Sequence, residues 1–259
     1  MPFTLSHAAA ALPLRRLLRG GAVFPALVIG CFIPDVPYFL PEPLASINAH
    51  LLPGLVIFGI PCGWAMYWFW QHALRGPAAA LLPRAYANLV FSAPSSAAQT
   101  PRWWSITLSL LVGALSHVVW DAFTHRRGVV VHAWPALARP IVHVHGHALP
   151  PYFIFQDIST LLGLLCLAMH VRYRLQQAAT NRLGATAPQL PTGAKVAVLA
   201  ALALGTVVLL GWMFSGPNAP VRSVYNFVCC TISASATVTV AYALAWHAGR
   251  RLASARHPR

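Results

Sequence analysis

Four long apolar runs without a charged residue restrict what this chain can fold into. They are Leu51–Trp70, Trp104–Trp120, Val196–Phe214 and Ser223–Trp246. A helix needs about 20 such residues, with a range of ~17–25, to cross the hydrocarbon core of a bilayer. Each run therefore predicts a transmembrane helix. A fifth is expected at Phe153–Met169, which carries Asp157.

Composition supports the same fold class. The chain is 58% hydrophobic and 8% charged, whereas soluble domains contain about 25% charged residues. We expect an all-α, polytopic membrane protein with about five transmembrane helices and a short N-terminal helical hairpin. It should form a single integral membrane domain over residues 1–259. Within it, residues 1–171 would bear the site, 172–195 form a basic linker, and 196–259 supply two C-terminal helices and a basic tail.

The N-terminal segment predicts two short helices, Thr4–Arg19 and Ala22–Ile33, separated by two glycines. At a rise of 1.5 Å per residue each would be only ~18–24 Å long, too short to cross a bilayer comfortably. A hairpin would place His7, near its start, beside Asp35, just after its end. One continuous span would instead put these two residues at opposite membrane faces.

Basic residues outnumber acidic ones, with 18 Lys and Arg against 4 Asp and Glu. They lie between the apolar runs, as topology signals do, so we expect membrane lipids and no nucleic acid as partners. One set of connections, within residues 15–19, 75–102, 172–195 and 250–259, holds 14 of the 18, and the other set holds 4. The bias predicts that the first set is cytoplasmic.

Two of the four acidic residues, Asp35 and Asp121, end apolar runs. A carboxylate there is tolerated when it is paired, hydrogen-bonded or bound to a cation. His117 precedes Asp121 by four residues, so on a helix the two side chains share a face about 5–6 Å apart. One metal ion can bind both at that spacing. Imidazole and carboxylate ligands suit zinc, or another divalent transition metal such as manganese or iron.

Other histidines join this candidate site because the predicted topology brings them to the same face. The candidate metal ligands are His7, Asp35, His50, His117 and Asp121. His125 continues the helical face, and His143, His145 and His147 are expected in a loop that covers the site. In a reaction, Asp35 and Asp121 would be the catalytic carboxylates, and Glu42 is free to accept a proton.

Each candidate also has a structural interpretation that involves no metal. His117 would then hydrogen-bond Asp121, and Asp35 would cap a turn after Pro34. His50 would be an interfacial histidine, and His125 would lie in solvent. His7 would simply lie near a helix N-terminus. Asp157 would stabilise the start of its own helix.

Several segments resemble a bacterial membrane family defined by domain of unknown function 4184. They are 1–7 (MPFTLSH), 26–30 (ALVIG), 33–39 (IPDVPYF), 50–54 (HLLPG) and 113–125 (GALSHVVWDAFTH). That family is similar to membrane-bound metal-dependent hydrolases, which share its P-D and S-H-x-x-x-D elements, and more distantly to the helical zinc-dependent phospholipase C fold. The resemblance implies His7, Asp35, His50, His117 and Asp121 as ligands. Because no H-x-x-x-E element or ligating N-terminal tryptophan is evident, it implies one or two ions.

These features predict a metal-dependent hydrolase in the bacterial inner (cytoplasmic) membrane. By analogy with the phospholipase fold, its substrate would be a lipid-linked or other phosphoester at the extracytoplasmic face. The alternative is a transporter, or a lipid- or protein-binding module, that uses buried Asp/His pairs as an ion relay. The alternative predicts Asp35 and Asp121 far apart beside a pore, whereas the enzyme requires them together.

Overall fold

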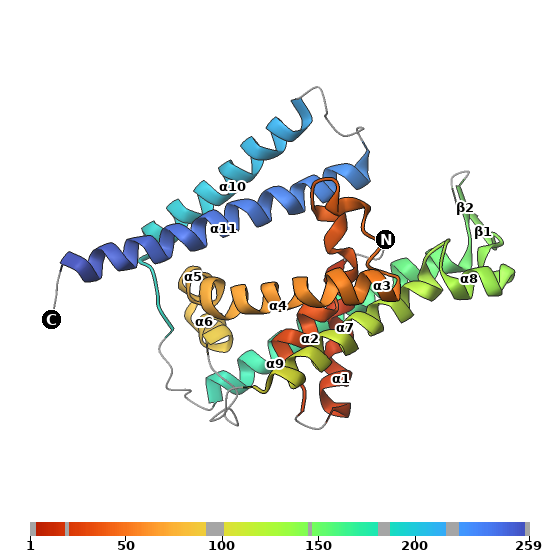
Figure 1. The fold of residues 1–259 in the computed structure, drawn as a ribbon, viewed down its shortest axis with the longest axis horizontal. Helices are drawn as coiled ribbons and strands as arrows, with labels where there is room; N and C mark the ends of the chain where they lie inside the picture. Colours follow the sequence, from red (N-terminus) through yellow and green to blue (C-terminus); the bar gives the residue numbers. More distant parts are fainter. Residues whose placement is uncertain are drawn as a thin grey trace. The chain divides into compact units, whose positions relative to one another are not determined.

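The computed structural model describes residues 4–18, 21–91, 101–144, 147–180, 187–215 and 223–256. These residues are mainly helical, with one short β-hairpin (Figure 1). The chain divides into two compact units. The first consists of Met1–Pro37, Ser46–Tyr67 and Ser96–Tyr173, and the second of Tyr38–Ala45, Trp68–Ser95 and Arg174–Arg259.

Five helical segments among the described residues are long and apolar enough to cross a membrane, as predicted. They are Leu52–Leu81, Trp103–Ala133, Pro151–Gln177, Thr192–Ser215 and Val224–Ala255. The second comprises α7 (Trp103–Thr124) and the short α8 (Val129–Ala133). The others include α9 (Pro151–Thr180), α10 (Thr192–Ser215) and α11 (Val224–Arg256). The all-helical, multi-pass fold class is therefore confirmed.

The first of these segments is not a uniform α-helix. Its α-helical parts are α3 (Leu52–Gly54), α4 (Ile60–Phe69) and α5 (Arg75–Leu81), joined by wider π-helical turns, η4 (Leu55–Gly59) and η5 (Trp70–Leu74). Pro61 follows the first wide turn. Since proline has no N–H to donate to the preceding turn, an irregularity is expected there. The helix continues past Trp70, where the predicted apolar run ended.

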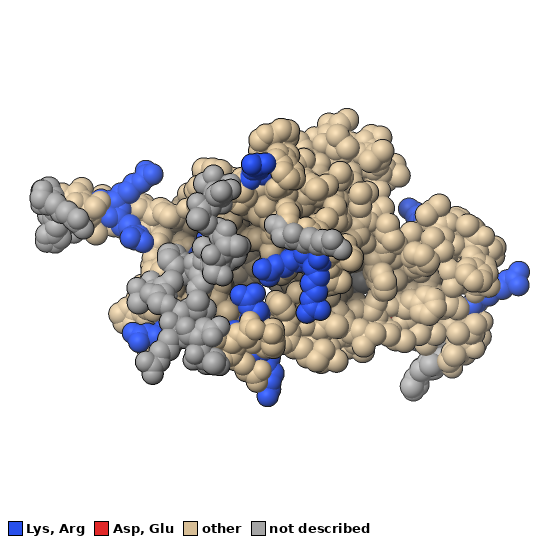
Figure 2. All heavy atoms as spheres, turned by 90° about the horizontal axis from the view of Figure 1, so that it is seen from below, with Lys and Arg blue, Asp and Glu red and all other residues tan. Residues whose placement is uncertain are grey.

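Large apolar side chains on these helices are exposed. Leu161 on α9 is 70% exposed and Val207 on α10 is 65% exposed, and α10 has no buried residue. In water such an apolar surface would promote aggregation, whereas lipid tails solvate it. Figure 2 shows one face of the molecule, on which Lys and Arg side chains are visible and no Asp or Glu side chain is. Two of the four carboxylates, Asp35 and Asp121, are buried instead.

The N-terminal segment of the first unit forms the predicted hairpin. A 3₁₀ helix, η1 (Thr4–Ala10), leads into α1 (Ala11–Leu17); α2 (Phe24–Gly30) then leads into a second 3₁₀ helix, η2 (Ile33–Phe39). Ala11, Leu27 and Cys31 form a buried cluster between the two arms. The first arm is 3₁₀ rather than α-helical before Ala11. The turn residues Arg19 and Gly20 lie outside the described residues.

The second arm of the hairpin packs directly on α7. A Cβ atom added to Gly30 would lie 2.4 Å from the Leu110 carbonyl oxygen, and one added to Gly113 would lie 2.3 Å from the Leu27 carbonyl oxygen. The two backbones therefore touch, as small residues allow in membrane helix pairs. This contact holds the end of α2, and η2 after it, against the part of α7 that precedes His117.

Two further contacts complete the core of the first unit. Ile33, Leu55 and Leu110 belong to its main buried cluster, which joins η2, the first long segment and α7. On the other side of the hairpin, a Cβ atom added to Gly163 of α9 would lie 2.8 Å from the Ser6 carbonyl oxygen. Helix α9 thus packs closely on η1.

Several short elements follow α7. After α8 come a 3₁₀ turn, η6 (Pro135–Ala138), and the strands β1 (Val142–Val144) and β2 (His147–Leu149). The strands are antiparallel, and His143 pairs with Ala148. Figure 1 shows this hairpin beside α8, beyond the C-terminal end of α7.

The second unit is built from α5, α6 (Arg84–Phe91), α10 and α11. A further 3₁₀ turn, η3 (Leu44–Ser46), covers the point in the sequence at which the chain passes from the second unit to the first. The Tyr242 hydroxyl of α11 donates to the Pro77 carbonyl at 3.2 Å. Lys195 donates to the Leu82 carbonyl at 2.8 Å, which satisfies an acceptor just beyond the end of α5.

Candidate metal centre

All five predicted ligands converge in the first unit, from four separate parts of the chain. His7 lies in η1, Asp35 in η2, and His50 in the segment that leads into α3. His117 and Asp121 lie one turn apart on α7, as their spacing predicted. His7, Asp35, His117 and Asp121 are buried, and the His50 side chain is 22% exposed.

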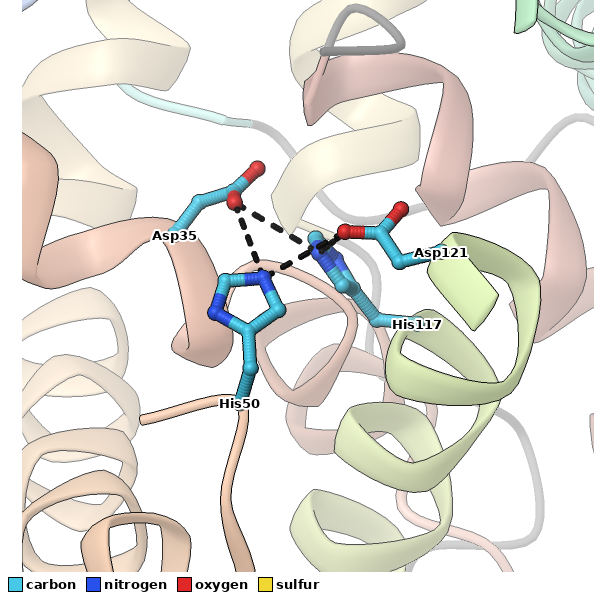
Figure 3. Close-up of side chains that lie close together, drawn as sticks. All are labelled: Asp35, His50, His117 and Asp121. Atoms are coloured by element: carbon cyan, nitrogen blue, oxygen red, sulfur yellow. Dashed lines mark ion pairs between the residues drawn. The ribbon is translucent and has the colours of Figure 1, made fainter. Parts of the chain in front are cut away.

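Four of them present one ligand atom each to a common point, with all four atoms within 4.8 Å of one another (Figure 3). The His117 Nε2 atom lies 3.5 Å from Asp35 Oδ1 and 3.2 Å from Asp121 Oδ2. The His50 Nε2 atom lies 3.6 Å from Asp35 Oδ1 and 3.3 Å from Asp121 Oδ2. Each ring thus faces both carboxylates.

The tautomer of His117 follows from its other nitrogen. Nδ1 lies 2.7 Å from the Cys31 carbonyl oxygen. A carbonyl can only accept, so Nδ1 carries the proton and donates it. In the neutral ring Nε2 then keeps its lone pair, which points at the two carboxylates. Metal-binding histidines are commonly oriented by such a bond from the second nitrogen.

The polar atoms at the centre lack hydrogen bonds. His7 Nε2, Asp35 Oδ1, His117 Nε2 and Asp121 Oδ1 are all buried without a hydrogen-bond partner among the described residues. An unsatisfied buried polar group costs about 1–3 kcal/mol, and more if it is charged. His117 Nε2 and Asp35 Oδ1 lie 3.5 Å apart, as do His7 Nε2 and Asp121 Oδ1, and a bound cation would satisfy these atoms.

A divalent ion fits this arrangement. Zinc bonds to nitrogen and oxygen ligands are about 2.0–2.2 Å long, so the ligand atoms of a tetrahedral site lie roughly 3.4 Å apart. The four nitrogen–oxygen distances, 3.2–3.6 Å, are close to that spacing, and the nitrogen–nitrogen and oxygen–oxygen pairs lie within 4.8 Å. The two carboxylates supply the negative charge that a buried dication requires.

The second oxygen of Asp121 faces two other histidines. Its Oδ1 atom lies 3.5 Å from His7 Nε2 and 3.3 Å from His125 Nδ1. The rings of His7 and His117 are stacked, with centroids 3.8 Å apart and planes at 16°. His7 therefore belongs to the cluster, as the hairpin predicted. The alternative that His125 lies free in solvent is wrong, since its side chain is only 27% exposed and contacts Asp121.

Neighbouring groups fix the orientation of the cluster. The Thr4 hydroxyl donates to Asp35 Oδ2 at 2.7 Å, leaving Oδ1 to face the histidines. The His50 backbone N–H donates to Asn48 Oδ1 at 3.1 Å, which shapes the turn before α3. Sequence reasoning did not assign Thr4 to the site. Its position one 3₁₀ turn before His7 is the signal that could have placed it on the same face.

His7 and Asp35 lie outside the membrane-spanning segments. Their pKa values correspond to a neutral imidazole beside an ionised carboxylate. Burial, aided by the neighbouring His117, lowers the pKa of His7 to about 4, so its ring is neutral near pH 7. Burial alone would raise the pKa of Asp35, but the attraction of the His117 ring in its protonated form and the hydrogen bond from the Thr4 hydroxyl outweigh burial. The net pKa of Asp35 is lowered, and its carboxylate is ionised. Neutral imidazole and ionised carboxylate are the forms that bind metal.

The other candidates lie outside the group. Glu42 is exposed and belongs to the second unit, and Asp157 on α9 is exposed. His143 is exposed on β1 and is not a member of the converging group. His145 lies outside the described residues, as does the His147 side chain. The predicted covering role of this loop therefore stays a prediction.

The comparison with known families agrees with the sequence motifs. The family model for Domain of unknown function (DUF4184) matches residues 1–247, which include the whole cluster. No curated protein and no solved structure matches the sequence. Since the match covers nearly the entire chain, from the N-terminal hairpin to α11, the protein belongs to the DUF4184 family.

Proposed function

We propose that the protein is a membrane-bound, metal-dependent hydrolase whose ion is held by Asp35, His50, His117 and Asp121, with His7 beside them. The observation that carries the proposal is the convergence of four ligand atoms, two of which, Asp35 Oδ1 and His117 Nε2, are buried without a hydrogen-bond partner among the described residues. Zinc suits the nitrogen and oxygen donors best, and manganese or iron is the next choice.

A bound divalent ion supplies Lewis acidity, which polarises a phosphoryl or acyl oxygen and makes water a stronger acid. The side chains of the protein supply the remaining catalytic functions. Asp35 and Asp121 are the catalytic carboxylates: both would hold the ion, and the second oxygen of Asp121, Oδ1, would accept a proton from water. Thr4 holds Asp35 in place through its hydroxyl. Of the four grouped residues His50 has the most exposed side chain, at 22%, so we place the approach of the substrate there.

The alternative, an ion relay in a transporter, predicts the two carboxylates at separate positions along a pore. Asp35 and Asp121 instead share both histidines of the group at 3.2–3.6 Å. Shared ligands in one place support a bound metal ion more than a chain of proton carriers.

The substrate and the location are part of the proposal. A site carried by helices with lipid-exposed surfaces suits a lipid-linked or other phosphoester as the substrate. The arginine bias favours the bacterial inner (cytoplasmic) membrane, with the site toward the extracytoplasmic face. Membrane lipids are then its immediate partners.

Metal content and hydrolysis test the function together. The protein, purified in detergent without added metal, is expected to carry at least one equivalent of zinc, manganese or iron by elemental analysis. It should hydrolyse a lipid phosphoester in mixed micelles. Chelation should abolish this activity, and the metal should restore it. Metal-free protein, or hydrolysis that chelation leaves unchanged, would contradict the proposal.

Topology is tested separately. Reporter fusions after Leu149, which follows the histidine-rich loop, and after Leu190, in the basic linker, should give opposite signals. The first is expected outside the cytoplasm and the second inside. Equal signals would show that the intervening helix α9 does not span, and reversed signals would put the site at the cytoplasmic face.

A further inference from the structure

The segment that follows α7, residues 126–142, exposes large apolar side chains. Val129 is 72% exposed, Trp134 is 64% exposed and Ile141 is 65% exposed. They come from α8, from the position between α8 and η6, and from the residue before β1. Apolar side chains gathered on one short segment in this way indicate a surface that contacts a partner or a membrane.

The same segment carries positive charge that no acidic residue within it balances. Arg126, Arg127 and Arg139 are exposed, and none of them forms a hydrogen bond or ion pair with another described residue. No Asp or Glu occurs between Asp121 and Asp157. The planar guanidinium of arginine presents several N–H donors that match phosphate oxygens. Apolar side chains beside such arginines are complementary to a bilayer surface with anionic headgroups.

The surface is continuous with the exposed aromatic ends of two membrane helices. Trp120 and Phe123, in the last turns of α7, are 47% and 44% exposed. Phe155, near the start of α9, is 46% exposed. Aromatic side chains are enriched where a transmembrane helix meets the lipid headgroups. The chain therefore leaves α7 and enters α9 at the bilayer interface, and the segment between them can lie along that interface.

Close packing at Gly128 holds the segment against the end of α7. A Cβ atom added to Gly128 would lie 2.4 Å from the Ala122 carbonyl oxygen and 2.8 Å from that of Asp121. The Gly128 N–H donates to the His125 carbonyl at 2.8 Å, and Val131 on α8 is only 2% exposed. The backbone that carries the exposed side chains is therefore anchored directly beside the candidate metal centre.

We propose that residues 126–142 bind the bilayer surface, with Trp134 and Ile141 at the edge of the hydrocarbon and the three arginines on the phosphates of anionic phospholipids. This inference rests on the multi-pass fold and needs no metal ion, so it goes beyond the proposed function. Its consequence for that function is a supply of anionic headgroups beside Asp121.

Charge also argues against a second copy of the chain as the occupant of this surface. Three arginines would then need carboxylates from the other copy. The chain has only four acidic residues, and Asp35 and Asp121 are buried in the cluster. Phospholipid phosphates are instead abundant wherever a transmembrane helix ends.

The test places the full-length protein, labelled with 5-fluorotryptophan, in phospholipid nanodiscs and records fluorine NMR spectra. Each tryptophan gives its own resonance, and Trp134→Phe identifies the resonance of Trp134 by its loss. A nitroxide carried by the lipids near their headgroups should broaden this resonance strongly. A water-soluble gadolinium chelate should broaden it much less.

The role of the arginines is measured on the same resonance. Replacing phosphatidylcholine stepwise by phosphatidylglycerol should shift it, and the lipid fraction at half the shift gives an apparent affinity. Arg126→Gln and Arg127→Gln should each weaken that affinity about fivefold, since each removes one charge at the membrane surface. The matched control, Arg84→Gln, removes an exposed arginine of the second unit. It should leave the titration unchanged.

Three results would overturn the inference. Stronger broadening by the chelate than by the lipid nitroxide would place Trp134 in water. Protection from both reagents would show that protein covers it. A titration without a shift would show that the surface does not select anionic lipid. The wild-type spectra decide all three, so a variant that does not fold leaves the test intact. Since no step involves metal or hydrolysis, failure here leaves the proposed function standing, and a metal-free protein leaves this inference standing.

Discussion

His117→Ala is expected to remove the metal from the proposed site and to abolish any metal-dependent hydrolysis. Among the histidines of the cluster it has the least exposed side chain, and its Nε2 atom faces both carboxylates. Losing a partner that only orients a metal ligand lowers affinity about 10–100-fold. Losing the ligand itself should exceed that, so metal affinity should fall by more than ~100-fold. Elemental analysis after dialysis and metal titration measure the loss.

Two controls separate ligand loss from loss of the fold. His117→Gln keeps a polar side chain of similar length and should retain more folded protein than alanine, with weaker metal binding than wild type. His72→Ala, which removes an exposed histidine of the second unit, should bind metal as wild type does. If folded His117→Ala, shown by an unchanged circular dichroism spectrum and elution volume, keeps its metal, the proposed centre is wrong.

Gly113→Leu is expected to prevent the first unit from folding. A Cβ atom at this position would meet the Leu27 carbonyl oxygen at 2.3 Å and the Gly30 Cα atom at 2.9 Å. These are backbone atoms, which cannot turn aside as a side chain does. Overpacking in a tight core costs about 1–3 kcal/mol, and more when the backbone must move. Gly113→Ala should fall in that range, and leucine should exceed it.

Gly211→Leu is the matched control, because nothing lies within 4 Å of the Cβ position of Gly211 on α10. Its thermal unfolding temperature in detergent should stay close to that of wild type, whereas Gly113→Ala should lower it and Gly113→Leu should give aggregated protein. A Gly113→Leu protein as stable as wild type would show that α2 and α7 do not touch here.

The two predictions are connected, because the glycine contact also places the metal ligands. Asp35 follows α2, and His117 follows Gly113 by four residues on α7. Separating the two helices would move Asp35 away from His117 and would break the bond from His117 to the Cys31 carbonyl. Gly113→Ala should therefore weaken metal binding as well as stability, although no glycine is a ligand.

Membrane helices were predictable because bilayer thickness sets a length that composition alone can match. The shared face of His117 and Asp121 was predictable because the helical period is constant. The N-terminal hairpin was predictable from lengths too short to span. The ends of the helices were less predictable, since α9 and α11 continue well beyond their apolar runs. Helical backbone does not stop where hydrophobicity stops.

The sequence by itself determined the class of fold and the types of ligand, because both depend on local composition and spacing. Tertiary structure alone decided which oxygen of Asp121 faces which ring, and brought His125 into contact with Asp121. It also assigned Thr4 to Asp35 and left Glu42 and Asp157 exposed. Such choices depend on contacts a few ångströms long between residues distant in the chain, which the packing of α2 on α7 and of η1 on α9 sets.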